Sequence, residues 1–224
     1  KARRWTTRRK CAAGKNLVGA FLQPKLVYAD LATLQTLAPR EVRAGLAEVI
    51  KYGVIRDAEL FALLESRGAE VLALDEDLLR HIVRRSCEIK AEVVAADERE
   101  GGLRAILNFG HTIGHAVEQA GGYGVLLHGE AISVGMVFAG MLSSELGDFP
   151  EADAARIRAL CESVDLPTVA PNLAMDQLRS ALAKDKKAVD AVPRFVLADA
   201  LGTVRFGVDV PSELLDTIWT RQHA

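Results

Sequence analysis

The sequence predicts a mainly α-helical protein with a short β-containing beginning. Three observations predict this fold class. From Pro39 onward, long stretches carry apolar residues at the spacing of a helix. Strand-like runs are short and occur near the start and near the end of the chain. The 224 residues contain no glycine-rich phosphate-binding loop and no series of strands that would form a full parallel sheet.

The segment before Pro39 carries the first β signals. Gly14-Lys15-Asn16 is typical of a turn, and Leu26-Val27-Tyr28 is a short strand-like run that follows Pro24. Pro39 suits the first turn of a helix. The sequence therefore predicts strands and turns before this position and helices after it.

The rest of the chain is expected to alternate helices with short breaks. The first helix begins at Pro39, a second follows Asp57, and the next are expected over 76–98, 104–120, 129–146, 151–163 and 174–184. Two apolar runs around Gly202, over 194–206, indicate a hairpin or a strand-loop-strand. A last helix is expected from Ser212 to about Trp219.

Composition excludes several classes of protein. The formal net charge of -2 lacks the basic excess of a general nucleic-acid binder. The longest apolar run, over 131–142, is too short to cross a bilayer. The cysteines are odd in number and far apart, at Cys11, Cys87 and Cys161, which fits a reducing, cytoplasmic setting rather than a disulfide framework.

Three histidines lie within a short stretch of chain. His111 and His115 are four residues apart, so a helix places both rings on one face. His128 follows a glycine-rich stretch that can fold it back toward them. Unrelated surface roles are the plain alternative, but imidazole is the commonest protein metal ligand and a frequent acid-base group. The cluster therefore predicts a functional site.

A metal site needs a ligand from another element, and Glu48 offers one. Two histidines and a carboxylate with an open fourth position form the ligand set of a catalytic zinc site. The alternative for Glu48 is an exposed ion pair with Lys51, one helical turn away.

Other charged residues have two interpretations each. Lys90 is either a solvated charge on a long helix or part of the site. Arg104 and Asn108 are expected on the same helical face as His111 and His115, as a polar stripe that costs stability unless it binds something. The 184–187 segment, Lys-Asp-Lys-Lys, is either a solvated turn or an anion clamp.

Three motifs closely resemble the 3-dehydroquinate synthase family. They are Gly45-Leu-Ala-Glu-Val-Ile-Lys-Tyr-Gly53, Leu107-Asn-Phe-Gly-His-Thr-Ile-Gly-His-Ala116 and Leu127-His-Gly-Glu-Ala131. The resemblance runs from about Ala12 to the end of the chain. It implies a multi-helical C-terminal domain over 39–224 that binds metal and substrate, preceded over 1–38 by a β-containing remnant of an NAD-binding α/β domain.

The resemblance also implies a role for each matching residue. The metal ligands would be Glu48, His111 and His128, and the metal zinc or cobalt. His115 would sit by the substrate phosphate and assist its elimination. The remaining matches imply substrate carboxylate and hydroxyl contacts (Lys90, Arg104, Asn108), an active-site lysine (Lys51), phosphate contacts (Asn16 and Lys186 or its neighbour Lys187) and NAD contacts (Lys15, Thr33, Leu34, Gln35, Thr36).

The activity that the resemblance implies is a cyclisation in the shikimate pathway. Bound NAD⁺ oxidises a hydroxyl of 3-deoxy-arabino-heptulosonate 7-phosphate, phosphate leaves, the hydride returns, and ring opening with aldol closure gives 3-dehydroquinate. The metal acts as a Lewis acid, and the enzyme would be a homodimer. Related rivals are the deoxy-scyllo-inosose and valiolone cyclases and metal-dependent alcohol or glycerol dehydrogenases. A non-catalytic helical module with a structural zinc is a rival of another class.

The chain departs from the family at its beginning. Residues 3–10 are Arg-Arg-Trp-Thr-Thr-Arg-Arg-Lys, where the family has an acidic segment rich in serine and glycine. We therefore expect residues 1–11 to be an aberrant stretch and the chain to be a fragment of a longer protein. Such a fragment is expected to bind zinc without NAD-dependent turnover.

Overall fold

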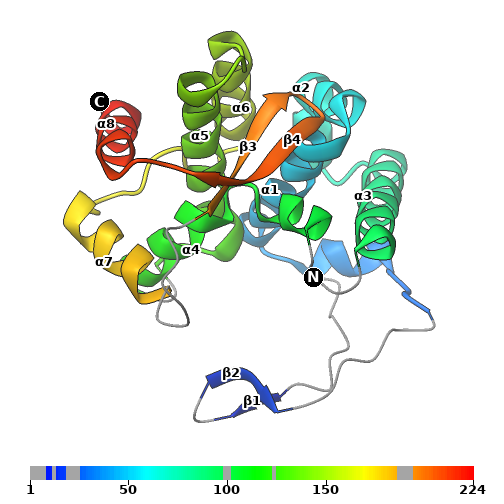
Figure 1. The fold of residues 1–224 in the computed structure, drawn as a ribbon. Coiled ribbons are helices and arrows are strands. Elements are labelled where there is room, and N and C mark those ends of the chain that lie inside the picture. Colours follow the sequence, from blue (N-terminus) through cyan, green and yellow to red (C-terminus); the bar gives the residue numbers. More distant parts are fainter. Residues whose placement is uncertain (1–8, 12–13, 19–25, 98–101, 123–124, 186–193) are drawn as a thin grey trace. The chain divides into compact units, whose positions relative to one another are not determined.

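The computed structural model describes residues 9–11, 14–18, 26–97, 102–122, 125–185 and 194–224. It divides into two compact units, Lys1–Thr36 and Leu37–Ala224, which are treated separately below. Both units are drawn in Figure 1.

The described residues of the first unit form a small hairpin and a short helix. Strands β1 (Arg9–Cys11) and β2 (Gly14–Val18) pair antiparallel, and η1 (Leu31–Thr36) is a 3-10 helix. The turn predicted at 14–16 is wrong, because these residues lie within β2. The strand predicted at 26–28 is also wrong. Leu26 and Tyr28 are about four-fifths exposed, and no strand among the described residues pairs with them.

The second unit is built mainly from helices, and most of their starts follow the sequence signals. They are α1 (Pro39–Arg56), α2 (Ala58–Leu72), α3 (Glu76–Ala96), α4 (His111–Ala120), α5 (His128–Leu146), α6 (Glu151–Ser163), α7 (Met175–Asp185) and α8 (Ser212–His223). Asp57 and Asp75 cap α2 and α3, because the side chain of each accepts a hydrogen bond from the backbone nitrogen three residues later. The last helix extends beyond the predicted end at Trp219.

Helix α5 is the centre of this unit. It contacts α1, α4, α6, α8 and strand β3 (Arg194–Ala200), and every residue from Gly129 to Gly140 is buried. A side chain at Gly129 would overlap the carbonyl oxygen of Ala44 on α1. The missing side chain therefore lets α1 and α5 approach closely at the point where α5 begins.

The helix predicted over 104–120 is wrong in one respect. Residues Leu103–Asn108 form a separate 3-10 helix, η2, and α4 starts only at His111. Gly110 lies between them with a φ of 75°, in the left-handed region, which ends one helix before the next begins. Arg104 and Asn108 are therefore not on the helical face that carries His111 and His115.

The predicted hairpin is confirmed. Strands β3 and β4 (Thr203–Asp209) pair antiparallel, and the turn between them contains Gly202, whose φ is 85°. The stretch from Phe195 to Ala198 is buried and lies against α5. The hairpin therefore adds a small sheet to the helical core.

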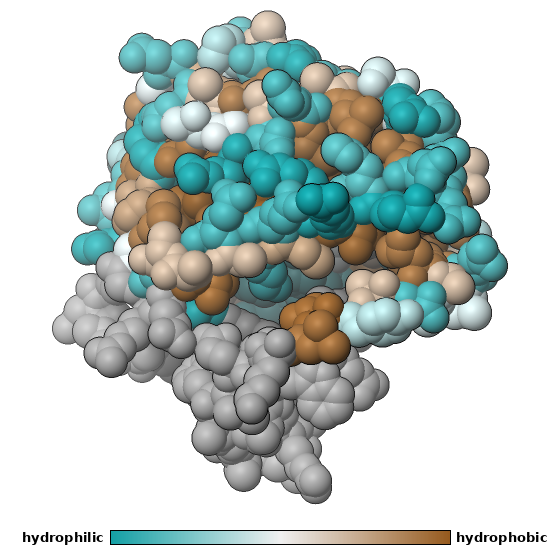
Figure 2. All heavy atoms as spheres, turned by 90° about the vertical axis from the view of Figure 1, so that its right-hand side faces the viewer, coloured by the Kyte–Doolittle hydropathy of each residue, from teal (hydrophilic) through white to brown (hydrophobic). Residues whose placement is uncertain are grey.

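Helix α3 lies at the outside of the second unit, on the right in Figure 1. It buries a single stripe of apolar residues and carries ion pairs such as Arg80–Glu76 and Arg84–Glu88. Figure 2 shows the side of the molecule that is on the right in Figure 1, and the described part of this face is mostly hydrophilic, with smaller apolar areas. None of the described helices combines the length and the apolar character that crossing a membrane requires.

Candidate metal centre

Three helices of the second unit bring one predicted metal ligand each. Glu48 lies in the middle of α1, His111 is the first residue of α4 and His128 is the first residue of α5. The Gly110 turn and the close contact at Gly129 fix where α4 and α5 begin. Two loop-to-helix junctions and one buried helix therefore place the three side chains.

The three side chains converge on one point. Oε1 of Glu48 lies 3.5 Å from Nε2 of His111 and 3.4 Å from Nε2 of His128. Potential ligand atoms of the three residues all lie within 4.8 Å of one another. The prediction that His128 folds back is confirmed, because its ring centroid is 5.5 Å from that of His111 and 5.4 Å from that of His115.

The outer hydrogen bonds of the two histidines fit a metal centre. Nδ1 of His111 lies 3.1 Å from the carbonyl oxygen of Phe109, and Nδ1 of His128 lies 3.2 Å from Oε2 of Glu118. Both partners only accept, so each Nδ1 carries a proton, and Nε2 is the ring nitrogen that would bind a cation. Both Nε2 atoms face Glu48, where a bound cation would take the place of the protons that the rings share with the carboxylate.

Electrostatics keeps Glu48 ionised. Burial alone would raise its pKa, but hydrogen bonds from His111 and His128 and the charge of Lys51 outweigh burial and hold the pKa below its ordinary value. Hydrogen bonding to Glu48 raises the pKa of His128. The centre therefore combines a carboxylate with two imidazoles, the donor set that suits a zinc-like divalent cation.

Lys51 is a buried partner of Glu48. Its Nζ lies 2.5 Å from Oε2 of Glu48, and the residue is only 3% exposed. Burial lowers the pKa of Lys51, and the charge of Glu48 partly offsets this. The simpler interpretation of an exposed Glu48–Lys51 pair is therefore wrong, since the lysine lies inside the protein.

An arginine–glutamate clamp was not predicted from the sequence. Arg40, in the first turn of α1, donates two hydrogen bonds to Glu130, at 2.6 and 2.7 Å, and a third to the carbonyl oxygen of Val125 at 2.8 Å. Glu130 also accepts from the backbone nitrogen of Leu127 at 2.7 Å. This clamp ties the start of α5, and with it His128, to the helix that carries Glu48.

A second group of potential ligands, His115, Glu118 and His128, shares His128 with the first. Nδ1 of His115 lies 3.8 Å from Oε2 of Glu118. An imidazole binds a cation through one nitrogen, and for His128 the nitrogen nearest the other two ligands is Nε2, beside Glu48, while Nδ1 faces Glu118. The second group is therefore better described as a hydrogen-bonding and charge network beside the candidate metal centre.

The other residues predicted for this unit lie on different elements. Lys90 is exposed on α3, and its charge acts on Lys51. Arg104 and Asn108 lie in η2, which contacts α1 and α3. The backbone nitrogen of Arg104 donates to Asp97 at 2.9 Å. Lys186 and Lys187 lie outside the described residues.

The predicted NAD and phosphate contacts of the first unit occupy two elements. Lys15 and Asn16 lie in strand β2. Thr33, Leu34, Gln35 and Thr36 lie in η1, where the hydroxyl groups of Thr33 and Thr36 donate to the backbone carbonyls of Asp30 and Thr33. These are local contacts that stabilise the turn.

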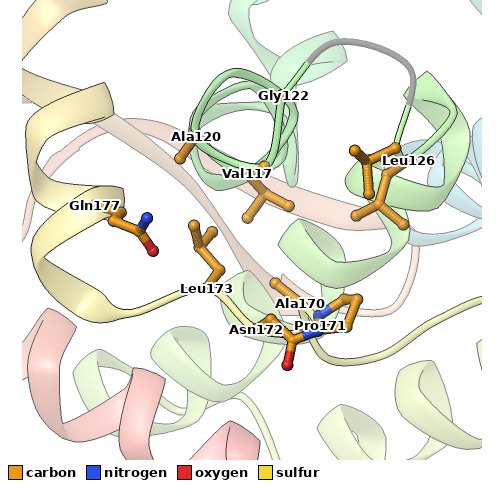
Figure 3. A pocket seen from close by; sticks show the side chains of 11 residues that line it. Val117, Ala120, Gly122, Leu126, Ala170, Pro171, Asn172, Leu173 and Gln177 are labelled. Atoms are coloured by element: carbon orange, nitrogen blue, oxygen red, sulfur yellow. The ribbon is translucent and has the colours of Figure 1, made fainter.

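A separate pocket lies at the other end of α4. Its volume is about 270 Å³, and Val117, Leu126 and Leu173 are among the residues that line it (Figure 3). Its lining residues include none of the three clustered histidines and no charged side chain. It is therefore distinct from the candidate metal centre.

The structure resembles solved enzymes of one class. A 2-epi-5-epi-valiolone synthase from Streptomyces hygroscopicus, solved with NAD⁺ and Zn²⁺ bound, matches with a TM-score of 0.85 and 30% identity over 96% of this chain and 60% of its own. A 2-deoxy-scyllo-inosose synthase complexed with carbaglucose-6-phosphate, NAD⁺ and Co²⁺ matches with a TM-score of 0.81 and 25% identity, covering 96% and 62%. The fold is therefore that of the sugar phosphate cyclases.

Sequence comparison identifies the family within this class. The family model described as 3-dehydroquinate synthase C-terminal matches residues 45–188, and the corresponding N-terminal model matches residues 8–44. The chain belongs to the 3-dehydroquinate synthase family.

Curated relatives agree with this family assignment. The 3-dehydroquinate synthase of Nitrosomonas europaea is 48% identical over 90% of this chain and 55% of its own length. That of Geobacter metallireducens is 51% identical over 84% and 52%. The chain thus spans about half the length of the curated relatives it matches.

Proposed function

We propose that this chain supplies the metal-binding and part of the substrate-binding half of a 3-dehydroquinate synthase. The reaction converts 3-deoxy-arabino-heptulosonate 7-phosphate to 3-dehydroquinate and phosphate, with NAD⁺ and a zinc or cobalt ion as cofactors. The observation that carries the proposal is the convergence of Glu48, His111 and His128 from three helices, with both Nε2 atoms facing the carboxylate. The complete enzyme is proposed to be a cytoplasmic homodimer.

The donor set supports cation binding by these three residues. Each histidine keeps its Nδ1 proton on an acceptor, so that a cation can replace the proton on Nε2, and Glu48 supplies a negative charge. When bound, the cation polarises a substrate oxygen as a Lewis acid, and NAD⁺ takes up and returns a hydride. The residues of this chain would hold the cation, orient the substrate and move protons.

His115 is proposed to move a proton on the phosphate side. Its ring centroid lies 5.3 Å from that of His111, and its side chain is 52% exposed, so a substrate held beside the metal ligands can reach it. Its Nδ1 lies 3.8 Å from Oε2 of Glu118, and imidazole is the side chain that most often transfers protons in enzymes.

The other predicted residues are proposed to orient substrate and cofactor. Lys51 neutralises part of the charge of Glu48 from inside the protein. The substrate carboxylate and hydroxyls would be held by Lys90, Arg104 and Asn108, the phosphate by Asn16 and Lys186, and the NAD by Lys15 and Thr33, Leu34, Gln35 and Thr36. Such positioning contributes through orientation rather than through bond chemistry.

Identity favours this reaction over the related cyclisations. The relatives named 3-dehydroquinate synthase are 48% and 51% identical, whereas the valiolone and scyllo-inosose synthases are 30% and 25% identical. Specificity among these cyclases depends on contacts around the sugar rather than on the metal ligands that they would share.

Two measurements test the proposal. The chain alone should bind one zinc ion and show no NAD-dependent turnover. Joined to the N-terminal domain of a relative such as the Nitrosomonas europaea enzyme, it should release phosphate from the heptulosonate phosphate and form 3-dehydroquinate, identified by mass spectrometry. Formation of another carbocycle would instead assign a related cyclase. Absence of zinc binding would contradict the proposed metal centre.

A further inference from the structure

One carboxylate lies between the metal ligand His128 and the proposed proton-transfer residue His115. Oε2 of Glu118 is 3.2 Å from Nδ1 of His128 and 3.8 Å from Nδ1 of His115. Glu118 and His115 are one helical turn apart on α4, whereas His128 begins α5. The same oxygen therefore faces both imidazoles, across the junction between two helices.

The position of Glu118 favours one orientation of the His128 ring. When a cation takes the place of the proton between Nε2 and Glu48, the ring keeps only its Nδ1 proton, and Oε2 of Glu118 accepts that proton at 3.2 Å. Glu118 therefore stabilises the ring orientation in which Nε2 binds the cation. The negative charge of Glu118 also makes the ring a stronger electron donor, as is typical of outer carboxylate partners of metal-binding histidines.

We propose that Glu118 is a positioning residue of the metal centre, acting through His128 and at the same time fixing the orientation of His115. This inference rests on the proposed function, because it concerns the ion that Glu48, His111 and His128 would hold. It adds a residue that neither the sequence motifs nor the ligand set assigns. The side chain of Glu118 is 21% exposed, so it can be changed without opening the core.

One alternative makes a different prediction. If His115, Glu118 and His128 themselves held the ion, the substitution His115→Asn would weaken binding as much as a change at Glu118. If Glu118 acts only through His128, His115→Asn leaves the zinc affinity of the chain unchanged. The two substitutions therefore separate a positioning residue from a ligand.

The test is a zinc titration of the full 224-residue chain against a competing chelator. We expect Glu118→Ala to weaken zinc binding by about 10–100-fold. Glu118→Gln should lose less, because its amide oxygen still accepts from Nδ1 while the charge is gone. The matched control is Glu145→Ala, which removes an ion-paired glutamate of similar type on α5, 3.0 Å from Arg221; its zinc affinity should equal that of the wild type.

A second readout reports on His128 directly. Ring ¹⁵N chemical shifts of the metal-free chain should show Nδ1 of His128 protonated in the wild type and in Glu118→Gln, and less fully protonated in Glu118→Ala. Wild-type affinity and unchanged protonation of Nδ1 in Glu118→Ala would overturn the inference, as would a large loss in His115→Asn. If the wild type itself binds no zinc, the proposed metal centre fails instead, and the ¹⁵N measurement still decides whether Glu118 holds the Nδ1 proton.

Discussion

Helices α5 and α3 differ in how much of their surface is buried by the rest of the second unit. Helix α5 is buried from Gly129 to Gly140 and contacts neighbours on several sides. Helix α3 buries one stripe and exposes a face of ion pairs. The residues of the candidate metal centre lie where α5 begins, beside α1 and α4. The candidate metal centre thus forms at the first turn of a helix that neighbouring elements hold in place on several sides.

The comparison predicts that the start of α5 tolerates change worst. Gly129→Ala should lower the free energy of unfolding by about 3 kcal/mol, because the new methyl group overlaps the Ala44 carbonyl. Gly45→Ala is the matched control: a Cβ there meets nothing within 4 Å. It should stabilise α1 by about 0.5–1 kcal/mol. Chemical denaturation measures both, and a loss of stability in both variants would contradict the close-approach argument.

A histidine of the candidate metal centre, His111 on α4, and an exposed histidine of α3 should differ in metal binding. His111→Ala removes a ligand and should weaken zinc binding by more than about 100-fold, beyond the loss typical of an outer partner. His81→Ala removes an exposed histidine of α3 and should leave the affinity unchanged. Equilibrium dialysis with zinc measures both. Equal affinities in the two variants would place the ion elsewhere.

The ion pair at the start of α5 and the ion pair on α3 should contribute differently to the free energy of unfolding. Arg40→Ala strands the carboxylate of Glu130, whose side chain is only 11% exposed, and should cost about 1–3 kcal/mol. Arg84→Ala removes a pair on α3 whose side chains are 79% and 42% exposed, which is worth about 0–1 kcal/mol. Thermal unfolding of both variants tests this difference. Equal losses would mean that the clamp is not needed to hold the start of α5.

The smallest expected change in stability concerns Asp57, which lies at the start of α2 and pairs with Arg85 on α3. Asp57 caps α2 and accepts from Arg85 at 2.5 Å; burial opposes its charge, but these hydrogen bonds hold its pKa below the ordinary 3.8. Its contribution is therefore present above that value and is lost as the pH falls through the lowered pKa. Asp57→Asn keeps a side chain that can cap α2 but removes the charge that faces Arg85, and should cost about 1 kcal/mol at neutral pH. The cost should shrink below about pH 4, and urea unfolding at both pH values checks it.

The helices were predictable where local signals were strong. Pro39 and the capping residues Asp57 and Asp75 mark helix starts, and Gly202 marks the hairpin turn. The single helix expected over 104–120 failed because a glycine at a left-handed position interrupts a run that is otherwise apolar at helical spacing. The strand expected at 26–28 failed because a strand needs a pairing partner, which a local pattern cannot supply.

The sequence by itself determined the helical class, the histidine cluster and, through its motifs, the family. The tertiary structure decided which atoms meet: Nε2 of two histidines with Glu48, Nδ1 of His128 with Glu118, and Arg40 with Glu130. The physical reason is the separation along the chain over which each interaction acts. Helix spacing and capping act over a few residues, whereas Arg40 and Glu130 are 90 positions apart and meet only because α1 packs on α5.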